Sequence, residues 1–183
     1  MCEIGLFALT MAQQQYHWSE ACETYLVDPC RHDEPPDPAF VPPQYQQPPG
    51  LLTQLLARGI DPGEITHLII THTHIDHYAG VTCEYKGQVV PCFPNARCLL
   101  NQADWEMTAL QHALLDPTSL ESRTLGVLWK AGMLEIIEGN VDLLPHVQIW
   151  QPLARHAVTR SFECTHKARR SPVSGTCTIT GLK

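Results

Sequence analysis

The chain has 183 residues, of which 44% are hydrophobic and 17% are charged, and its formal net charge is -7. This composition is typical of one globular domain and argues against a disordered chain. The acidic balance argues against a nucleic-acid partner, and no apolar run approaches the length of a membrane span. The N-terminus lacks the basic region of a signal peptide, so we expect a cytoplasmic protein that contacts no membrane.

The eight cysteines contain no CxxC pair. Their spacing argues against a disulfide scaffold and against a thiolate zinc finger. We expect free, partly buried thiols in a reducing compartment.

The first part of the chain predicts a strand, a loop, a helix and a second strand. Residues 24–28 form a short apolar run typical of a buried strand. The eight prolines of residues 29–49 predict an extended loop, which is either functional or a plain insertion. Helical spacing follows in residues 51–58, with Gly59 at the place of a C-terminal cap. Because residues 65–70 are again apolar, the order indicates a crossover between parallel strands.

The rest of the chain predicts further strands and two helices before the pattern fades. Lys86, Gly87 and Gln88 are typical of a hairpin tip. The predicted strands are 97–100, 134–137 and 147–150, and the predicted helices are 102–115 and 118–131, separated by Asp116 and Pro117. After Trp150 the apolar periodicity is lost, and neither helix nor strand is predicted.

The segment Thr71-His72-Thr73-His74-Ile75-Asp76-His77 directly follows the second apolar strand. Imidazole and carboxylate together suit a borderline divalent metal such as zinc. His72 and His74 alternate with a period of two, so in extended backbone they point the same way. Asp76 and His77 lie where the chain turns toward a helix. We therefore predict His72 and His74 as ligands of one metal and Asp76 and His77 as ligands of a second; the alternative is a histidine-rich polar loop.

The His-x-His-x-Asp-His pattern resembles the signature of the metallo-β-lactamase fold hydrolases. Residues 25–28 and 59–67 also resemble that family's approach to the motif. The segment 93–97, followed by Asp104-Trp105-Glu106, is similar to the branch of N-acyl-homoserine-lactone lactonases and related lactone or organophosphate hydrolases. The resemblance covers roughly residues 24–150. It implies an α/β fold of the αββα sandwich type.

The resemblance also implies roles for single residues. His72 and His74 would bind the first zinc ion, and Asp76 and His77 the second. Asp76 would in addition act as the catalytic residue that orients the attacking water. Asp28 resembles a carboxylate that steadies the motif loop; alternatively it only ends a strand. His67 lies inside the strand and is expected to be structural.

The chain departs from the family after residue 150. The family completes its site with a histidine after a Pro-Gly turn, a bridging aspartate and a last histidine. Here His156 lies near the place of the third histidine without that context, and no aspartate follows residue 142. We therefore expect an incomplete sandwich, with a truncated metallo-β-lactamase-like domain at residues 1–151 and an atypical tail at 152–183.

A reading-frame hypothesis accounts for this tail. In a shifted frame, degenerate codons for residues 152–159 permit a Pro-Gly turn and a histidine. Codons for residues 175–180 similarly permit an aspartate followed by histidines. The coding DNA decides whether the tail is out of frame. If the tail is as written, we expect weak metal binding with one zinc ion or none.

The function expected from the motif and the resemblance is hydrolysis of a small-molecule lactone or related ester by a metal-activated hydroxide. The alternatives are a thioester hydrolase of the glyoxalase II type and a catalytically silent fragment that binds metal. A redox di-iron site is disfavoured because that variant has a carboxylate where His74 stands. The substrate, the metal identity and the oligomeric state stay open.

Overall fold

The computed structural model describes residues 7–10, 14–20, 23–30, 49–144, 147–150, 161–166 and 175–180. The greater part of the proline-rich segment and His156 lie outside these ranges. In the described part of the chain, no helix combines the length and apolar character needed to cross a membrane.

A six-stranded sheet forms the centre of the fold. Its strands, in spatial order, are β1 (Phe7–Thr10), β2 (Gln14–Glu20), β3 (Glu23–Val27), β4 (His67–Ile70), β7 (Arg97–Asn101) and β8 (Leu134–Ile137). Strands β3, β4, β7 and β8 run parallel, whereas β2 pairs antiparallel with β3 and β1 pairs antiparallel with β2. The predicted crossover from β3 to β4 is confirmed, with α1 (Leu51–Ala57) between them.

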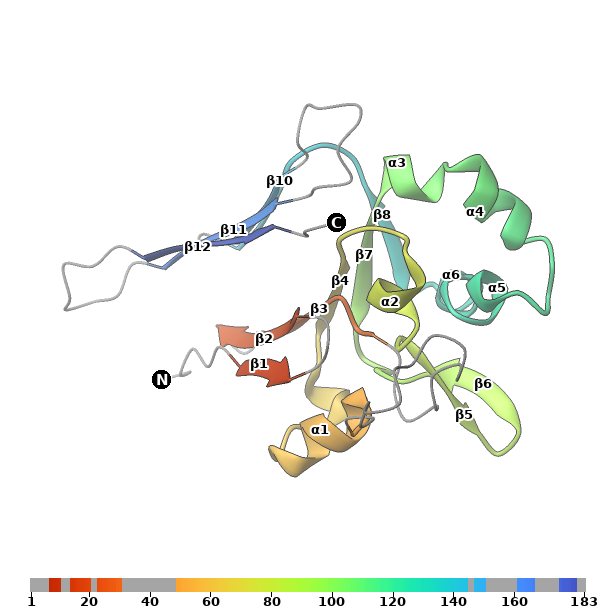
Figure 1. Ribbon diagram of the computed structural model, residues 1–183, viewed down its shortest axis with the longest axis horizontal. Helices are drawn as coiled ribbons and strands as arrows, with labels where there is room; N and C mark the ends of the chain where they lie inside the picture. The colour runs from red at the N-terminus through yellow and green to blue at the C-terminus, as the bar shows by residue number, and fades with distance from the viewer. Residues whose placement is uncertain are drawn as a thin grey trace, which may run out of the picture.

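The parallel strands are apolar because both of their faces are covered. Leu68, Ile69 and Ile70 of β4 are all buried, which is the continuous apolar pattern of a strand between two layers. Figure 1 shows the hairpin β5 (Thr82–Tyr85) and β6 (Gln88–Pro91) and the helices α3 to α6 on one side of β4, β7 and β8. One buried cluster joins strands, helices and hairpin; its members include Leu26, Leu55, Leu68, Leu100 and Leu128.

The prediction of two long helices at 102–115 and 118–131 is wrong, because each region forms two short helices. The observed helices are α3 (Gln102–Trp105), α4 (Thr108–Ala113), α5 (Leu120–Arg123) and α6 (Leu125–Lys130). Met107 has an extended ψ of 125°, and Thr124 has φ -116° and ψ -87°. The Thr124 hydroxyl donates to the Leu120 carbonyl at 2.6 Å, a side-chain bond that competes with continued helix.

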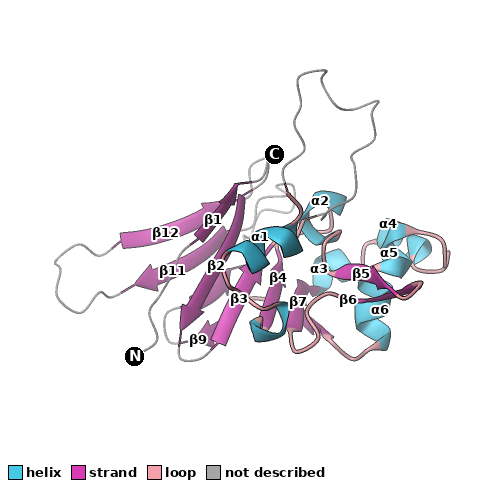
Figure 2. Cartoon of the chain, turned by 90° about the horizontal axis from the view of Figure 1, so that it is seen from below, coloured by secondary structure: helices cyan, strands magenta, loops and turns pink. Residues whose placement is uncertain are grey.

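The predicted hairpin tip at residues 86–88 is confirmed, but the prediction that no strand follows Trp150 is wrong. Lys86 and Gly87 both have positive φ, as a two-residue hairpin turn requires. A second, antiparallel sheet contains β9 (Val141–Leu144), β10 (Val147–Trp150), β11 (Ser161–His166) and β12 (Gly175–Thr180). Its last two strands pair antiparallel with each other, from His166 with Gly175 to Ser161 with Thr180, and their many polar residues hide them from apolar periodicity. In Figure 2, β2, β3, β4 and β7 lie side by side, with α5 and α6 beyond them. The division at residues 151 and 152 stays a prediction.

Candidate metal centre

The motif lies at the carboxyl end of β4, in the middle of the parallel strands. Residues 71–74 form the loop after β4, and α2 (Ile75–Tyr78) begins directly after His74. Asp76 and His77 therefore lie in a short, one-turn helix, where the sequence predicts the chain to turn toward a helix. In parallel sheets this edge is where functional side chains collect, because loops after the strands meet there.

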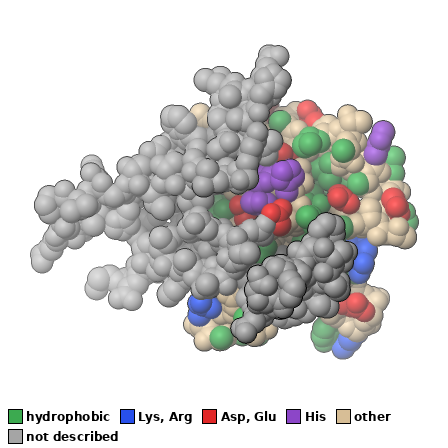
Figure 3. All heavy atoms as spheres, viewed as in Figure 1, with side chains coloured by type: hydrophobic (Ala, Val, Ile, Leu, Met, Phe, Trp, Pro, Cys, Tyr) green, Lys and Arg blue, Asp and Glu red, His purple; other side chains and the backbone are tan. Residues whose placement is uncertain are grey.

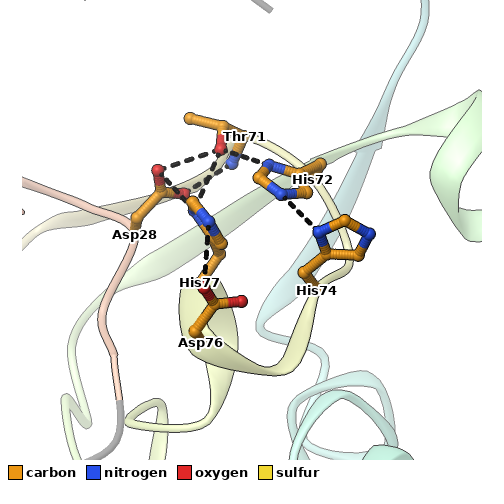
Figure 4. Close-up of polar contacts among 6 residues, drawn as sticks. All are labelled: Asp28, Thr71, His72, His74, Asp76 and His77. Atoms are coloured by element: carbon orange, nitrogen blue, oxygen red, sulfur yellow. Dashed lines mark hydrogen bonds and ion pairs between the residues drawn. The ribbon is translucent and has the colours of Figure 1, made fainter. Parts of the chain in front are cut away.

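Asp28 connects β3 to the motif loop (Figure 4). Its Oδ1 accepts from the Thr71 backbone N–H at 2.8 Å, and its Oδ2 accepts from the Thr71 hydroxyl at 2.9 Å. The same Oδ2 lies 2.9 Å from Nδ1 of His77. Asp28 is buried and has φ 50°, so it also turns the chain at the end of β3. Asp28 therefore both contacts the motif loop and ends strand β3.

His72 and His74 lie together, as their alternation predicts. Nε2 of His72 is 3.1 Å from Nδ1 of His74, and the two rings meet edge to face. Zinc binds histidine nitrogen at about 2.0–2.1 Å, so two nitrogens on one tetrahedral ion lie about 3.3 Å apart. The spacing of these two atoms therefore fits ligation of one ion.

Asp76 and His77 form the second pair of donor atoms. Oδ2 of Asp76 lies 3.6 Å from Nε2 of His77, a separation that also fits two ligands on one ion. The rings of His72 and His77 have centroids 3.8 Å apart, so the two pairs are adjacent. In Figure 3, histidine side chains gather near the middle of one face, with acidic side chains beside them.

The ionisation of His77 reflects its two acidic neighbours. Partial burial by itself lowers the pKa of His77, but the hydrogen bond and charge of Asp28 and the charge of Asp76 outweigh it. The pKa of His77 is therefore raised above its ordinary value of 6.5. Metal ions compete with protons for this imidazole.

The described residues supply two donor pairs and not a complete site. Within the described ranges, no group of three or more histidine, cysteine, aspartate or glutamate side chains is arranged to hold one metal ion. Structural and catalytic zinc sites use three or four protein ligands. Each pair by itself therefore supplies fewer ligands than such a site uses.

Comparison with known proteins identifies the fold. Residues 23–82, which contain β3, β4 and the motif, match the family model of the metallo-beta-lactamase superfamily. No curated protein matches the sequence significantly. Among solved structures, an N-acyl homoserine lactone hydrolase with the product N-hexanoyl-L-homoserine at its catalytic metal centre matches with TM-score 0.55 and 18% identity, over 83% of this chain and 58% of its own.

Two further solved structures are similar to this chain in fold. The hydrolase AbOPH of the beta-lactamase superfamily matches with TM-score 0.57 and 15% identity, over 94% of this chain and 57% of its own. A putative metallo-beta-lactamase from Thermotoga maritima matches with TM-score 0.56 and 15% identity, over 97% of this chain and 73% of its own. The chain has the metallo-β-lactamase fold. It spans little more than half the length of the first two structures, and the predicted fold class is confirmed.

Sequence reasoning did not identify several residues that contact the motif and the chain around it. The Thr71 hydroxyl contacts Asp28 and His72, and the Tyr78 hydroxyl donates to Oε1 of Glu121 at 3.1 Å. Gly80 lies directly against the Cys30 carbonyl. A hydroxyl residue directly before a histidine ligand is the signal that could have indicated Thr71. The other two contacts join segments that are distant in sequence, which leaves no local signal.

Proposed function

We propose that the protein is a metal-dependent hydrolase of a small-molecule lactone or related ester. Two donor pairs carry the proposal: His72 with His74 in the loop after β4, and Asp76 with His77 in α2, which follows that loop directly. The metallo-β-lactamase fold supports it, because an N-acyl homoserine lactone hydrolase of similar structure holds its product at a catalytic metal centre.

The chemistry of each side chain gives it a separate role in the proposed hydrolysis. Zinc, when bound, would polarise an ester carbonyl and make water more acidic. His72 and His74 would hold one ion, and Asp76 and His77 a second. Among the four donors Asp76 is the carboxylate, and its half-exposed side chain can accept a proton from an attacking water. Asp28 would hold the motif loop in place through its hydrogen bonds to Thr71.

Apolar side chains beside the donors suit the acyl part of a substrate. Ile75, which lies between His74 and Asp76, is 50% exposed, and Met107 is 48% exposed. Sδ of Met107 is 3.7 Å from the Thr73 hydroxyl, so the α3–α4 junction borders the motif loop. An exposed apolar surface next to polar donors is the usual composition of a small-molecule site.

Substrate profiling of the zinc-loaded full chain tests the proposal. We expect turnover of acyl lactones above that of aryl esters, thioesters and phosphotriesters, and loss of turnover after chelation. A clear preference for thioesters would instead support a hydrolase of the glyoxalase II type. No turnover of any of the four classes would refute the proposed activity.

A catalytically silent metal-binding fragment is the second candidate. It is favoured by the observation that the described residues contain no group of three metal ligands. Metal analysis of the purified chain separates the two candidates. About two equivalents of zinc per chain would support the hydrolase, whereas one or none, without turnover, would support the silent fragment.

A further inference from the structure

One buried carboxylate and one hydroxyl contact histidines of both donor pairs. The Thr71 hydroxyl lies 2.9 Å from Asp28 Oδ2, 2.9 Å from His72 Nδ1 and 3.4 Å from His77 Nδ1. Asp28 Oδ2 in turn lies 2.9 Å from His77 Nδ1. Figure 4 shows this chain of contacts running from Asp28 through Thr71 to His72. The Nε2 atoms of both histidines lie on the side of the metal donors.

Counting protons determines the direction of each hydrogen bond. An ionised carboxylate only accepts, so the single hydroxyl proton of Thr71 goes to Asp28. The hydroxyl oxygen must then accept from His72, which places a proton on Nδ1 of that ring. His77 Nδ1 is nearer to Asp28 than to Thr71 and donates to the carboxylate. In the neutral rings, both Nε2 atoms therefore carry a lone pair that a metal can use.

We propose that Thr71 is a positioning residue whose hydroxyl relays the charge of Asp28 to His72 and fixes the tautomer in which Nε2 can bind metal. One carboxylate thereby orients a ligand of each donor pair, His77 directly and His72 through Thr71. The consequence for catalysis rests on the proposed metal-dependent hydrolase. The assignment of the tautomer itself rests only on the contacts.

The variants Thr71→Val and Thr71→Ser separate the hydroxyl from the rest of the side chain. Valine has the shape of threonine and keeps the backbone N–H that donates to Asp28, whereas serine keeps the hydroxyl. Thr82→Val is the matched control, because Thr82 is also buried and its hydroxyl donates to the Arg123 carbonyl at 3.1 Å, outside the motif. Thermal unfolding of all four proteins checks that each is folded.

The first measurement is the tautomer of His72 in the metal-free protein, from long-range proton–nitrogen NMR at about pH 8.5, where neutral imidazole prevails. The wild type, Thr71→Ser and Thr82→Val should carry the proton on Nδ1, and Thr71→Val should shift it toward Nε2. The second is zinc affinity by competition with a chromophoric chelator. Thr71→Val should weaken affinity about 10- to 100-fold, as loss of a group that orients a ligand does, and the other two variants should stay close to wild type.

Retention of the Nδ1 proton in Thr71→Val would overturn the proposal, as would equal behaviour of the valine and serine variants. A wild type that binds no zinc would refute the proposed function, while the NMR result would still decide the role of Thr71. Equal loss of zinc affinity in Thr71→Val and Thr82→Val would assign the effect to general destabilisation and would also overturn the proposal.

Discussion

Asp76 differs from the other motif donors in charge, and unlike His72 it is partly exposed. It is the carboxylate of the four, its side chain is 41% exposed, and it lies 3.6 Å from the ring of His77. His72 by contrast is buried and is held by Thr71. Under the proposed function, Asp76 would therefore ligate a metal and still contact water, as a residue that orients the attacking nucleophile must.

Substitution of Asp76 by asparagine tests this assignment. Asparagine keeps the shape but loses the charge, so we expect at least one equivalent of zinc to be lost and turnover to fall about 100-fold or more. Asp116→Asn, in the exposed link between α4 and α5, removes the same charge outside the motif and should change neither quantity. Metal analysis and initial rates give the answer; unchanged zinc content and rate in Asp76→Asn would remove Asp76 from the site.

Helix α2 is held in place by contacts at its end. The Gly80 N–H donates to the Pro29 carbonyl at 2.9 Å, and a Cβ on Gly80 would lie 1.8 Å from the Cys30 carbonyl oxygen. The chain leaving α2 therefore passes directly against the chain leaving β3. Because Asp28 precedes that same stretch, this close approach fixes the distance between Asp28 and the motif.

Gly80→Ala should disturb this approach. A clash with backbone cannot be relieved by a side-chain rotation, so we expect a loss of about 1–3 kcal/mol or more in the free energy of unfolding and weaker zinc binding. Gly126→Ala is the control, since a Cβ there, inside α6, meets atoms only at 3.5 Å or beyond and improves helix propensity. Urea denaturation measures both; equal stability of the two variants would contradict the close approach.

At the scale of the whole molecule, the core that supports the site also buries ionisable groups. Burial raises the pKa of the Cys98 thiol above 9.0. Burial and contact with Cys83 raise the pKa of Cys92, and burial and the charge of Glu121 raise the pKa of Tyr78 above 10.0. These groups belong to the cluster that joins β4, β7 and α2, so their ionisation and the packing of the core are linked.

Stability should consequently fall at alkaline pH. Above pH 9 the unfolded chain releases protons from these groups while the folded protein keeps them, so the unfolded state binds fewer protons and the free energy of unfolding decreases as pH rises. Cys98 alone contributes a slope of up to about 1.4 kcal/mol per pH unit. Urea titrations under reducing conditions at several alkaline pH values measure it. Cys98→Ala should flatten the slope, and a stability that does not decline would contradict the burial of these protons.

The local pattern of the sequence predicted the elements that depend on local chemistry. The crossover from β3 to β4, the Gly59 cap, the turn at Lys86 and Gly87 and the position of the motif after a buried strand are all found. Each follows from apolar periodicity or from backbone conformations that few residues adopt. The four candidate donors of the motif were predicted for the same reason, because their spacing is short and regular; their role as metal ligands stays a prediction.

Other features are not visible in apolar periodicity. The helices break at Met107 and Thr124, and β11 and β12 form in segments of mixed polar and apolar residues. His72 and His77 could be chosen as ligands from the sequence by itself. Only the tertiary structure brought Asp28 across 43 residues to Thr71, because the parallel pairing of β3 and β4 places their carboxyl ends together. The sequence therefore determined which side chains could bind a metal, and the sheet decided which of their nitrogens contact Asp28 and Thr71.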